Sequence, residues 1–249
     1  MASVLSLLFV LVLSGAAQAQ ELAVPESAAD QVVRARVVAE KEARLSAEIS
    51  GVIASHHVGE GDEFERGTVL VSVRCNTQDA QLSEANAELG VAIATRDANR
   101  NLIKTGSVGN LELAVSEGQV AQAEASVDLA MARANQCRVV APFSGVVVKQ
   151  HRKDSEYVSA SEPLLDILDP SHLQVEFLAP SSWLVWLTAD KPFDLKIDET
   201  QEFVSGRLLR IGSRVDPVSQ SIRLTGEITS DVAGVIPGMS GTLWFRDMP

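Results

Sequence analysis

The sequence is poor in the residues that usually mark an enzyme or a metal centre. Aromatic residues make up only 4% of the 249 residues, so no single large aromatic core is indicated. The two cysteines and four histidines show no C-x-x-C or Cys/His zinc spacing. His56 and His57 are adjacent, so on a strand they would point to opposite faces, and we interpret them as surface or turn residues. The nucleophile-elbow, P-loop and H-E-x-x-H patterns are absent. We therefore expect no catalytic, cofactor or metal site.

Positive charge is also scarce. The chain carries 21 Lys and Arg against 33 Asp and Glu, a net charge of −12. An acidic surface repels the phosphates of nucleic acids and of anionic lipids. The balance therefore argues against both as partners, and solubility is its simplest explanation.

Long apolar runs are absent after the first residues. Residues 4–13 read VLSLLFVLVL and are followed by Ala17-Gln18-Ala19, a pattern typical of a secretory signal peptide, although its Met-Ala-Ser start carries no Lys or Arg. The run is too short to span a membrane comfortably. We predict that residues 1–19 are a signal peptide and that the exported chain begins at Gln20.

One sequence pattern occurs twice in the chain. Residues 49–73 and 143–167 align without a gap at an offset of 94 positions. Apolar, glycine and acidic positions keep their character, which predicts one unit of about four short strands used twice. The identical pairs are Ser50/Ser144, Gly51/Gly145, Val52/Val146, His57/His151 and Leu70/Leu164. Glycine supplies positive φ or close backbone approach at turns, and we assign that role to Gly51, Gly59, Gly61, Gly67 and Gly145.

Between the copies the periodicity becomes helical. Residues 77–103 carry apolar residues at three- and four-residue steps, namely Leu82, Ala85, Leu89, Ala92 or Ile93, and Leu102. Residues 111–136 carry a heptad seam of Leu113, Ser116, Val120, Ala123, Val127, Ala130 and Ala134. With the glycine-containing turn 104–110, this predicts an antiparallel coiled-coil hairpin about 40 Å long, with Asn76 or Thr77 as its first N-cap. We interpret so long a polar projection as a partner-binding element rather than an ornament.

Cys75 and Cys137 bracket this insert. The two ends of an antiparallel hairpin lie side by side, and export permits oxidation, so a disulfide would clamp its base. In the chain-entropy model a loop of this length gives roughly 4 kcal/mol of stabilisation. Two buried thiols are the alternative, and the Cα separation decides between them.

The last third of the chain returns to β structure. Strand-like runs occupy 173–177, 193–197, 203–211, 221–228 and 241–245. A short amphipathic stretch, 181–187, starts with serine caps and places Trp183 and Trp186 on one face, where we expect core packing. Residues 31–39 alternate Val and Arg and could supply the missing strand of a small β-barrel.

The sequence thus predicts a mainly β, α+β chain. We assign 20–40 to a lead-in and first barrel strand, 41–75 to the first half-motif, 76–136 to the hairpin, 137–170 to the second half-motif and 171–249 to the barrel.

Several motifs, taken in order, resemble a known family. The two copies resemble the half-motifs of a lipoyl domain, a barrel-sandwich hybrid, split by a coiled-coil hairpin. VVAPFSGVV at 139–147, with Pro142 and Gly145, resembles the second half-motif, and VGEGD at 58–62 resembles the first. VDPVSQSIRL at 215–224, with Asp216 and Pro217, resembles the family's VDPxxRTxRV segment, and the PGM turn recurs as Pro237, Gly238 and Met239. Together they resemble the HlyD-like periplasmic adaptor, or membrane fusion, proteins of tripartite efflux pumps.

The resemblance implies a periplasmic subunit that links an inner-membrane transporter, of the RND type in the first instance, to an outer-membrane channel. Copies would form a ring, usually a hexamer, with the barrel facing the transporter and the hairpin tip facing the channel. The tip residues implied are Arg100, Leu102, Lys104, Gly106, Ser107, Val108, Gly109 and Asn110. In the family's docking pattern of Arg, Leu and Ser, only Leu102 matches. Ala98 and Gly109 take the other two positions, and Arg100 lies close enough to substitute.

Two alternatives stay open at this point. An adaptor of an ATP-driven exporter or type I secretion system would share the fold, but the type I adaptors usually carry an uncleaved membrane helix and a longer hairpin. A lipoyl or biotinyl carrier would need a lysine at the turn that joins the halves, and Lys149 and Lys153 lie elsewhere. Because the sequence stops soon after the PGM turn, we also expect no membrane-proximal domain.

Overall fold

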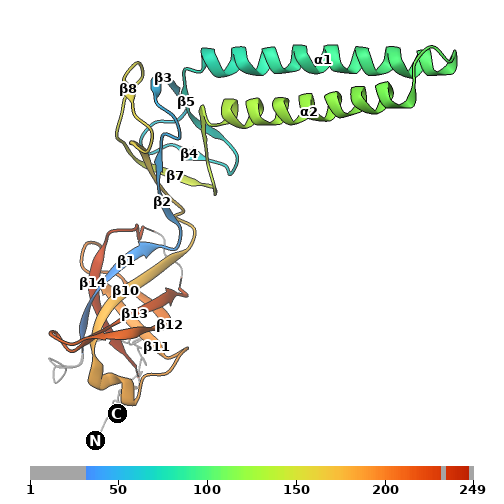
Figure 1. Ribbon diagram of the computed structural model, residues 1–249. Helices are drawn as coiled ribbons and strands as arrows, with labels where there is room; N and C mark the ends of the chain where they lie inside the picture. Colours follow the sequence, from blue (N-terminus) through green and yellow to red (C-terminus); the bar gives the residue numbers. More distant parts are fainter. Residues whose placement is uncertain (1–31, 231–233, 247–249) are drawn as a thin grey trace, which may run out of the picture.

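The computed structural model describes residues 32–230 and 234–246. The predicted signal peptide and its cleavage site lie outside these residues. Figure 1 shows an L-shaped molecule, in which a β-barrel lies below a small β-sandwich and a two-helix hairpin projects sideways from the sandwich. Among the helices that are described, none has the length and apolar character needed to cross a membrane.

The barrel is closed by a strand that precedes the hairpin in the sequence. Strand β1 (Val33–Ala39) pairs antiparallel with both β10 (Leu173–Pro180) and β14 (Ser240–Phe245), as the alternating pattern at 31–39 predicts. The closed order is β1-β10-β13-β12-β11-β14. The remaining strands are β11 (Pro192–Ile197), β12 (Phe203–Asp216) and β13 (Ser221–Ile228).

Aromatic rings fill one end of the barrel. Phe177, Phe193 and Phe245 are buried, with ring centroids 6.1 to 6.2 Å apart. Trp183 and Trp186 pack on Phe245 at 6.1 and 5.5 Å, which confirms the predicted core role of the tryptophans. They lie on and just after a 3₁₀ helix, η1 (Ser181–Val185). The predicted serine cap is wrong, because Pro180 occupies the N-cap position and no side chain caps η1. The backbone N–H of Ser181 donates to the Gln220 carbonyl at 2.8 Å.

Two motif turns hold the barrel ends. In the PGM turn, the Gly238 N–H donates to Val37 O and the Val37 N–H donates to Met239 O, both at 2.8 Å, so the turn pairs with β1. Gly238 has φ +101°, a conformation that favours glycine. At the β12–β13 turn, the Asp216 carboxylate accepts the N–H groups of Val218 and Ser219 at 2.9 and 2.8 Å. These hydrogen bonds to Ser219 and Val218 lower the pKa of Asp216.

The sandwich contains the two sequence copies, and their strands recur at the 94-residue offset. Strands β3 (Gly51–His56), β4 (Glu63–Phe64) and β5 (Val69–Val73) correspond to β7 (Gly145–Gln150), β8 (Tyr157–Val158) and β9 (Pro163–Leu168). The flanking strands are β2 (Glu42–Ser46) and β6 (Arg138–Val140). The duplication predicted from the sequence is confirmed.

The two copies exchange strands. The sheets run β2-β9-β7-β4 and β6-β5-β3-β8, so each copy gives its short second strand to the sheet of the other copy. Symmetric hydrogen bonds hold the exchange: Gly61 N–H donates to Val147 O at 2.8 Å, and Ser155 N–H donates to Ile53 O at 3.0 Å. Neither copy can therefore complete its sheet without the other.

The identical serines of the repeat hold this exchange. The Ser50 hydroxyl accepts the Ala160 N–H at 3.0 Å, and the Ser144 hydroxyl accepts the Arg66 N–H at 2.9 Å. Each serine therefore caps a turn of the opposite copy, which explains why the repeat keeps a serine at this position.

An acidic residue in each copy also reaches the other. The Glu60 carboxylate accepts the Gln150 N–H at 2.8 Å, and Asp154 accepts the His56 N–H at 2.8 Å. Asp154 additionally bonds His56 Nδ1 at 2.6 Å, and this side-chain hydrogen bond lowers the pKa of Asp154. The His56 side chain is only 6% exposed, so its interpretation as a surface residue is wrong. His57 is exposed and bonds Ser72 Oγ at 3.0 Å.

The glycines of the repeat serve two separate needs. Gly61 and Gly67 have φ near +87° and +88°, as expected at turns. Gly145 and Gly51 lie in strands without positive φ, so a turn role for them is wrong. A Cβ on Gly145 would lie 2.1 Å from Leu168 O. Close approach of the β9 backbone, rather than a left-handed conformation, requires glycine there.

We predict that Gly145→Ala destabilises the protein, and Gly145→Val at least as much, because even one added methyl meets the Leu168 carbonyl. The expected loss of unfolding free energy is about 2 kcal/mol or more. Thermal melting with Gly118→Ala as the control tests this, since Gly118 is helical with nothing within 4 Å of an added Cβ. A melting temperature of Gly145→Ala equal to that of the parent would refute the close-approach argument.

Candidate functional site

The hairpin consists of α1 (Asn76–Lys104) and α2 (Asn110–Asn135), which run side by side away from the sandwich (Figure 1). On α2 every predicted seam position is buried or half-buried, which confirms the heptad assignment. On α1 the inward positions include Leu82, Ala85 and Leu89, as predicted, and end at Ile103. The assignment of Leu102 to the seam is wrong, because the three-and-four step from Leu89 reaches Ile103. Leu102 is 43% exposed.

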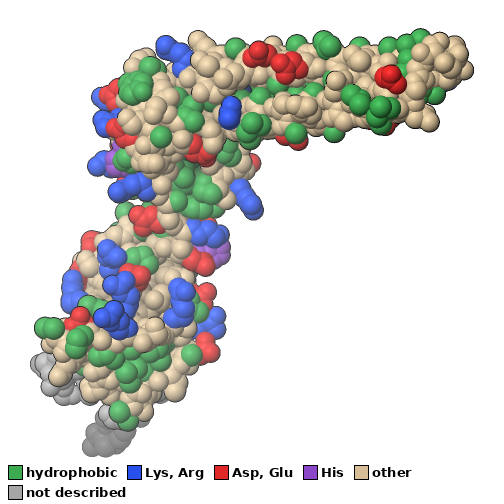
Figure 2. Space-filling model, viewed as in Figure 1, with side chains coloured by type: hydrophobic (Ala, Val, Ile, Leu, Met, Phe, Trp, Pro, Cys, Tyr) green, Lys and Arg blue, Asp and Glu red, His purple; other side chains and the backbone are tan. Residues whose placement is uncertain are grey.

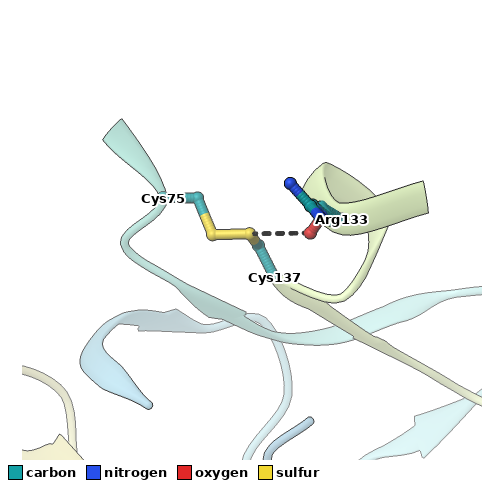
Figure 3. Close-up of a disulfide and its surroundings, with 3 residues drawn as sticks. All are labelled: Cys75, Arg133 and Cys137. Carbon is teal, nitrogen blue, oxygen red and sulfur yellow. Dashed lines mark hydrogen bonds between the residues drawn. A yellow bond between two sulfur atoms is a disulfide. The ribbon is translucent and has the colours of Figure 1, made fainter. Parts of the chain in front are cut away.

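The base of the hairpin is closed by a disulfide between Cys75 and Cys137 (Figure 3). Their Cα atoms lie 6.1 Å apart across 62 positions of sequence, within the range that a disulfide requires. The Cys137 sulfur also lies 3.7 Å from Arg133 O. The cysteines are oxidised in this structure, so the alternative of two buried thiols does not hold.

The disulfide also marks where strands become helices. The Val73 N–H donates to Cys137 O at 2.8 Å, so the pairing of β5 with β6 continues to the bridge. Cys75 itself occupies the N-cap of α1, and its carbonyl accepts the Asp79 N–H at 2.9 Å. The predicted caps Asn76 and Thr77 are therefore wrong: the helix starts directly at the bridge, without a side-chain cap.

The tip is a five-residue turn, 105–109, between the helices. The Leu102 carbonyl accepts the Ser107 N–H at 3.0 Å and the Thr105 hydroxyl at 2.8 Å, which closes the end of α1. Gly106 has φ +68°, and Gly109 precedes α2, with its N–H bonded to the Glu112 carboxylate at 3.2 Å. This left-handed conformation favours glycine at 106.

The structure brings the predicted tip residues together, with different exposures. Ser107, Gly109 and Asn110 are exposed, and Val108 is half-buried. Lys104 Nζ donates to Asn101 Oδ1 at 3.1 Å. Arg100 does not stand free, because its guanidinium pairs with Glu117 of α2 at 3.2 Å.

Sequence reasoning missed one apolar residue at the tip. Leu111 lies in the first turn of α2 and is 75% exposed, more than Leu102. Its position two residues before the seam residue Leu113 is the signal that could have identified it, since a heptad seam leaves that position outside. Leu102 and Leu111 thus give each helix an exposed leucine within one turn of the tip.

Metal binding has no support at this site. No group of three or more His, Cys, Asp and Glu residues gathers as a metal-ligand set anywhere in 32–230 and 234–246.

No family model matches the chain. It is 24% identical over 222 residues to the multidrug resistance protein MdtA of Yersinia enterocolitica, a match that covers 78% of this chain and 50% of the relative. The MdtA protein of Yersinia pestis matches equally. The chain resembles the membrane fusion proteins, or periplasmic adaptors, of efflux pumps. It spans about half the length of these MdtA relatives.

Solved structures share the fold. A MacA–MexA chimeric protein that contains the Pseudomonas aeruginosa MexA α-hairpin domain superposes with a TM-score of 0.79 at 14% identity, covering 86% of this chain and 80% of that one. The membrane fusion protein Spr0693 of Streptococcus pneumoniae R6 gives 0.73 at 18% identity, covering 88% and 99%. The predicted architecture of split sandwich, hairpin and barrel is thereby confirmed.

We predict that the double variant Cys75→Ser/Cys137→Ser loosens the hairpin base and loses up to roughly 4 kcal/mol of unfolding free energy. Amide hydrogen exchange should accelerate in the first turn of α1 and at Arg138–Val140. The barrel amides, which the disulfide does not constrain, are the internal control. Unchanged exchange at the hairpin base would show that helix packing alone holds it.

Proposed function

We propose that this chain is a periplasmic adaptor subunit of a tripartite efflux pump, linking an inner-membrane transporter to an outer-membrane channel. The observation that carries the proposal is the disulfide-clamped hairpin, which projects from a domain whose two halves are interlocked. At 1.5 Å per residue its helices reach about 40 Å from the sandwich. Such a projection suits a protein that spans a gap between two partners.

The arrangement of the domains supports opposite partners at opposite ends. The tip lies at one extreme of the molecule and the barrel at the other (Figure 1). We propose that the tip, with Leu102 and Leu111 exposed, meets the channel and that the barrel meets the transporter, with copies assembled as a ring. The work of such a subunit is binding and positioning, and no reaction is assigned to it.

The transporter is proposed to be of the RND type, with an ATP-driven exporter as the alternative. Affinity purification of the chain from membranes, followed by mass spectrometry, tests both. A transporter with large periplasmic loops supports the first, and an ATP-binding-cassette subunit supports the second. Recovery of neither, together with no effect of deletion on drug susceptibility, would refute the adaptor function.

We predict that Leu102→Asp abolishes pump function without unfolding the protein. The side chain is 43% exposed, so a carboxylate there costs little in the free chain, but it would be desolvated in an apolar contact with the channel. Minimum inhibitory concentrations in a strain that depends on the pump give the readout, and circular dichroism checks the fold.

Leu129→Asp is the matched control, since Leu129 is 54% exposed on the same hairpin but lies near its base. Full drug resistance of the Leu102→Asp strain would contradict docking through the tip. Equal loss in both variants would show that the effect is not specific to the tip.

A further inference from the structure

Apolar side chains protrude at the end of the barrel that lies away from the sandwich. Val185 ends η1 and Val218 occupies the β12–β13 turn, and each is 93% exposed. The two segments adjoin, because the Ser181 N–H donates to Gln220 O at 2.8 Å. Leu178 of β10 is 57% exposed beside them and lines a depression with Ser181 and Gln220.

Two guanidinium groups lie next to Leu178. Arg214 and Arg223 line a depression of about 400 Å³ together with Leu178 and Asp216. Within the described part of the chain, neither arginine has a carboxylate partner. Asp216 is engaged by the N–H groups of its own turn.

A second depression of about 640 Å³ continues this surface. Arg34 and Arg36 line it, along with Leu178 and Arg223. These two arginines pair with Asp198 and Glu176, at 2.6 and 3.3 Å. Four arginines therefore lie on this surface beside three carboxylates, which are Glu176 and Asp216 in the depressions and Asp198 paired with Arg34. We call Leu178, Val185, Arg214, Val218 and Arg223 the distal barrel surface.

Figure 2 shows Lys and Arg side chains gathered over the barrel and apolar side chains at its lower end. This local surplus of positive charge exists in a chain with a net charge of −12. Electrostatic attraction acts over about 10 Å at 0.1 M salt, so a surface responds to the local charge rather than to the total. The exclusion of anionic lipid from net charge alone therefore does not apply to this surface.

We propose that the distal barrel surface binds an anionic phospholipid surface, with Val185 and Val218 entering the headgroup region and Arg214 and Arg223 bonding lipid phosphates. Guanidinium groups form bidentate, charge-assisted hydrogen bonds with phosphate. Single apolar side chains that are 93% exposed suit a fluid surface, which adapts to them, whereas a protein partner would need matching pockets. The proposal goes beyond the adaptor function and does not depend on it, since vesicle binding requires neither transporter nor channel.

Co-sedimentation of the chain from Gln20 onward with phosphatidylglycerol vesicles tests the electrostatic part. We expect binding to these vesicles, little to phosphatidylcholine vesicles, and a decline as salt rises. Each basic residue near an anionic surface contributes roughly fivefold in partitioning, so Arg214→Gln/Arg223→Gln should bind about thirtyfold more weakly.

Lys149→Gln/Lys153→Gln is the control, because it removes the same charge from two exposed lysines of the sandwich. It should bind as the parent does. All variants share one amino terminus, so the comparison is independent of residues 1–31. Equal losses in both double variants would overturn the proposal in favour of non-specific attraction.

The apolar part is tested with Val218→Cys carrying an environment-sensitive fluorophore, with Val148→Cys of the sandwich, 50% exposed, as the control. Quenching of position 218 alone by brominated phosphatidylglycerol is expected. No quenching at 218, or no binding to anionic vesicles, would overturn the proposal. Crosslinking of position 218 in cells to an acidic protein, without vesicle binding, would assign the surface to a protein partner instead.

Discussion

The exchange of short strands between the two copies is the constraint on which the rest of the structure depends. β4 completes the sheet of β7, and β8 completes the sheet of β3, so the halves fold only as a pair although the hairpin separates them in sequence. Any insert between them must leave and return at nearly one point. Two antiparallel helices of similar length satisfy this requirement, and the Cys75–Cys137 bridge fixes the point itself.

The barrel is tied to the sandwich by two chain segments rather than one. β1 runs into β2 while β9 runs into β10, and the Asp169 N–H donates to Lys41 O at 2.9 Å where the segments pass. The Asp169 carboxylate is nearly buried, and its hydrogen bond from the Ser171 hydroxyl is the main cause of its lowered pKa. A doubled connection resists twisting more than a single linker does, which suits a molecule that would hold partners at its two ends.

Charge is distributed unevenly over this frame. Within residues 32–230 and 234–246, Arg214 and Arg223 lie at one end of the barrel without a carboxylate partner, whereas the net charge of the chain is strongly acidic. Net charge predicts solubility and long-range repulsion, but contacts within a Debye length depend on the local arrangement. The net charge therefore argues against an anionic lipid partner, whereas the local charge of the distal barrel surface favours one.

The sequence by itself determined the duplication, the α2 seam and the barrel strands, because periodicity and spacing are local properties that burial preserves. The bridge between Cys75 and Cys137 was decided by their Cα separation, which the sequence left open. Only the tertiary structure decided the details that depend on backbones far apart in sequence. The Leu168 carbonyl requires a glycine at position 145, and the side chain of His56 is bonded by Asp154 of the other copy. Ile103 rather than Leu102 occupies the last seam position of α1. Exposure at the tip and the basic end of the barrel likewise arise only when the strands close, since closure decides which side chains remain outside.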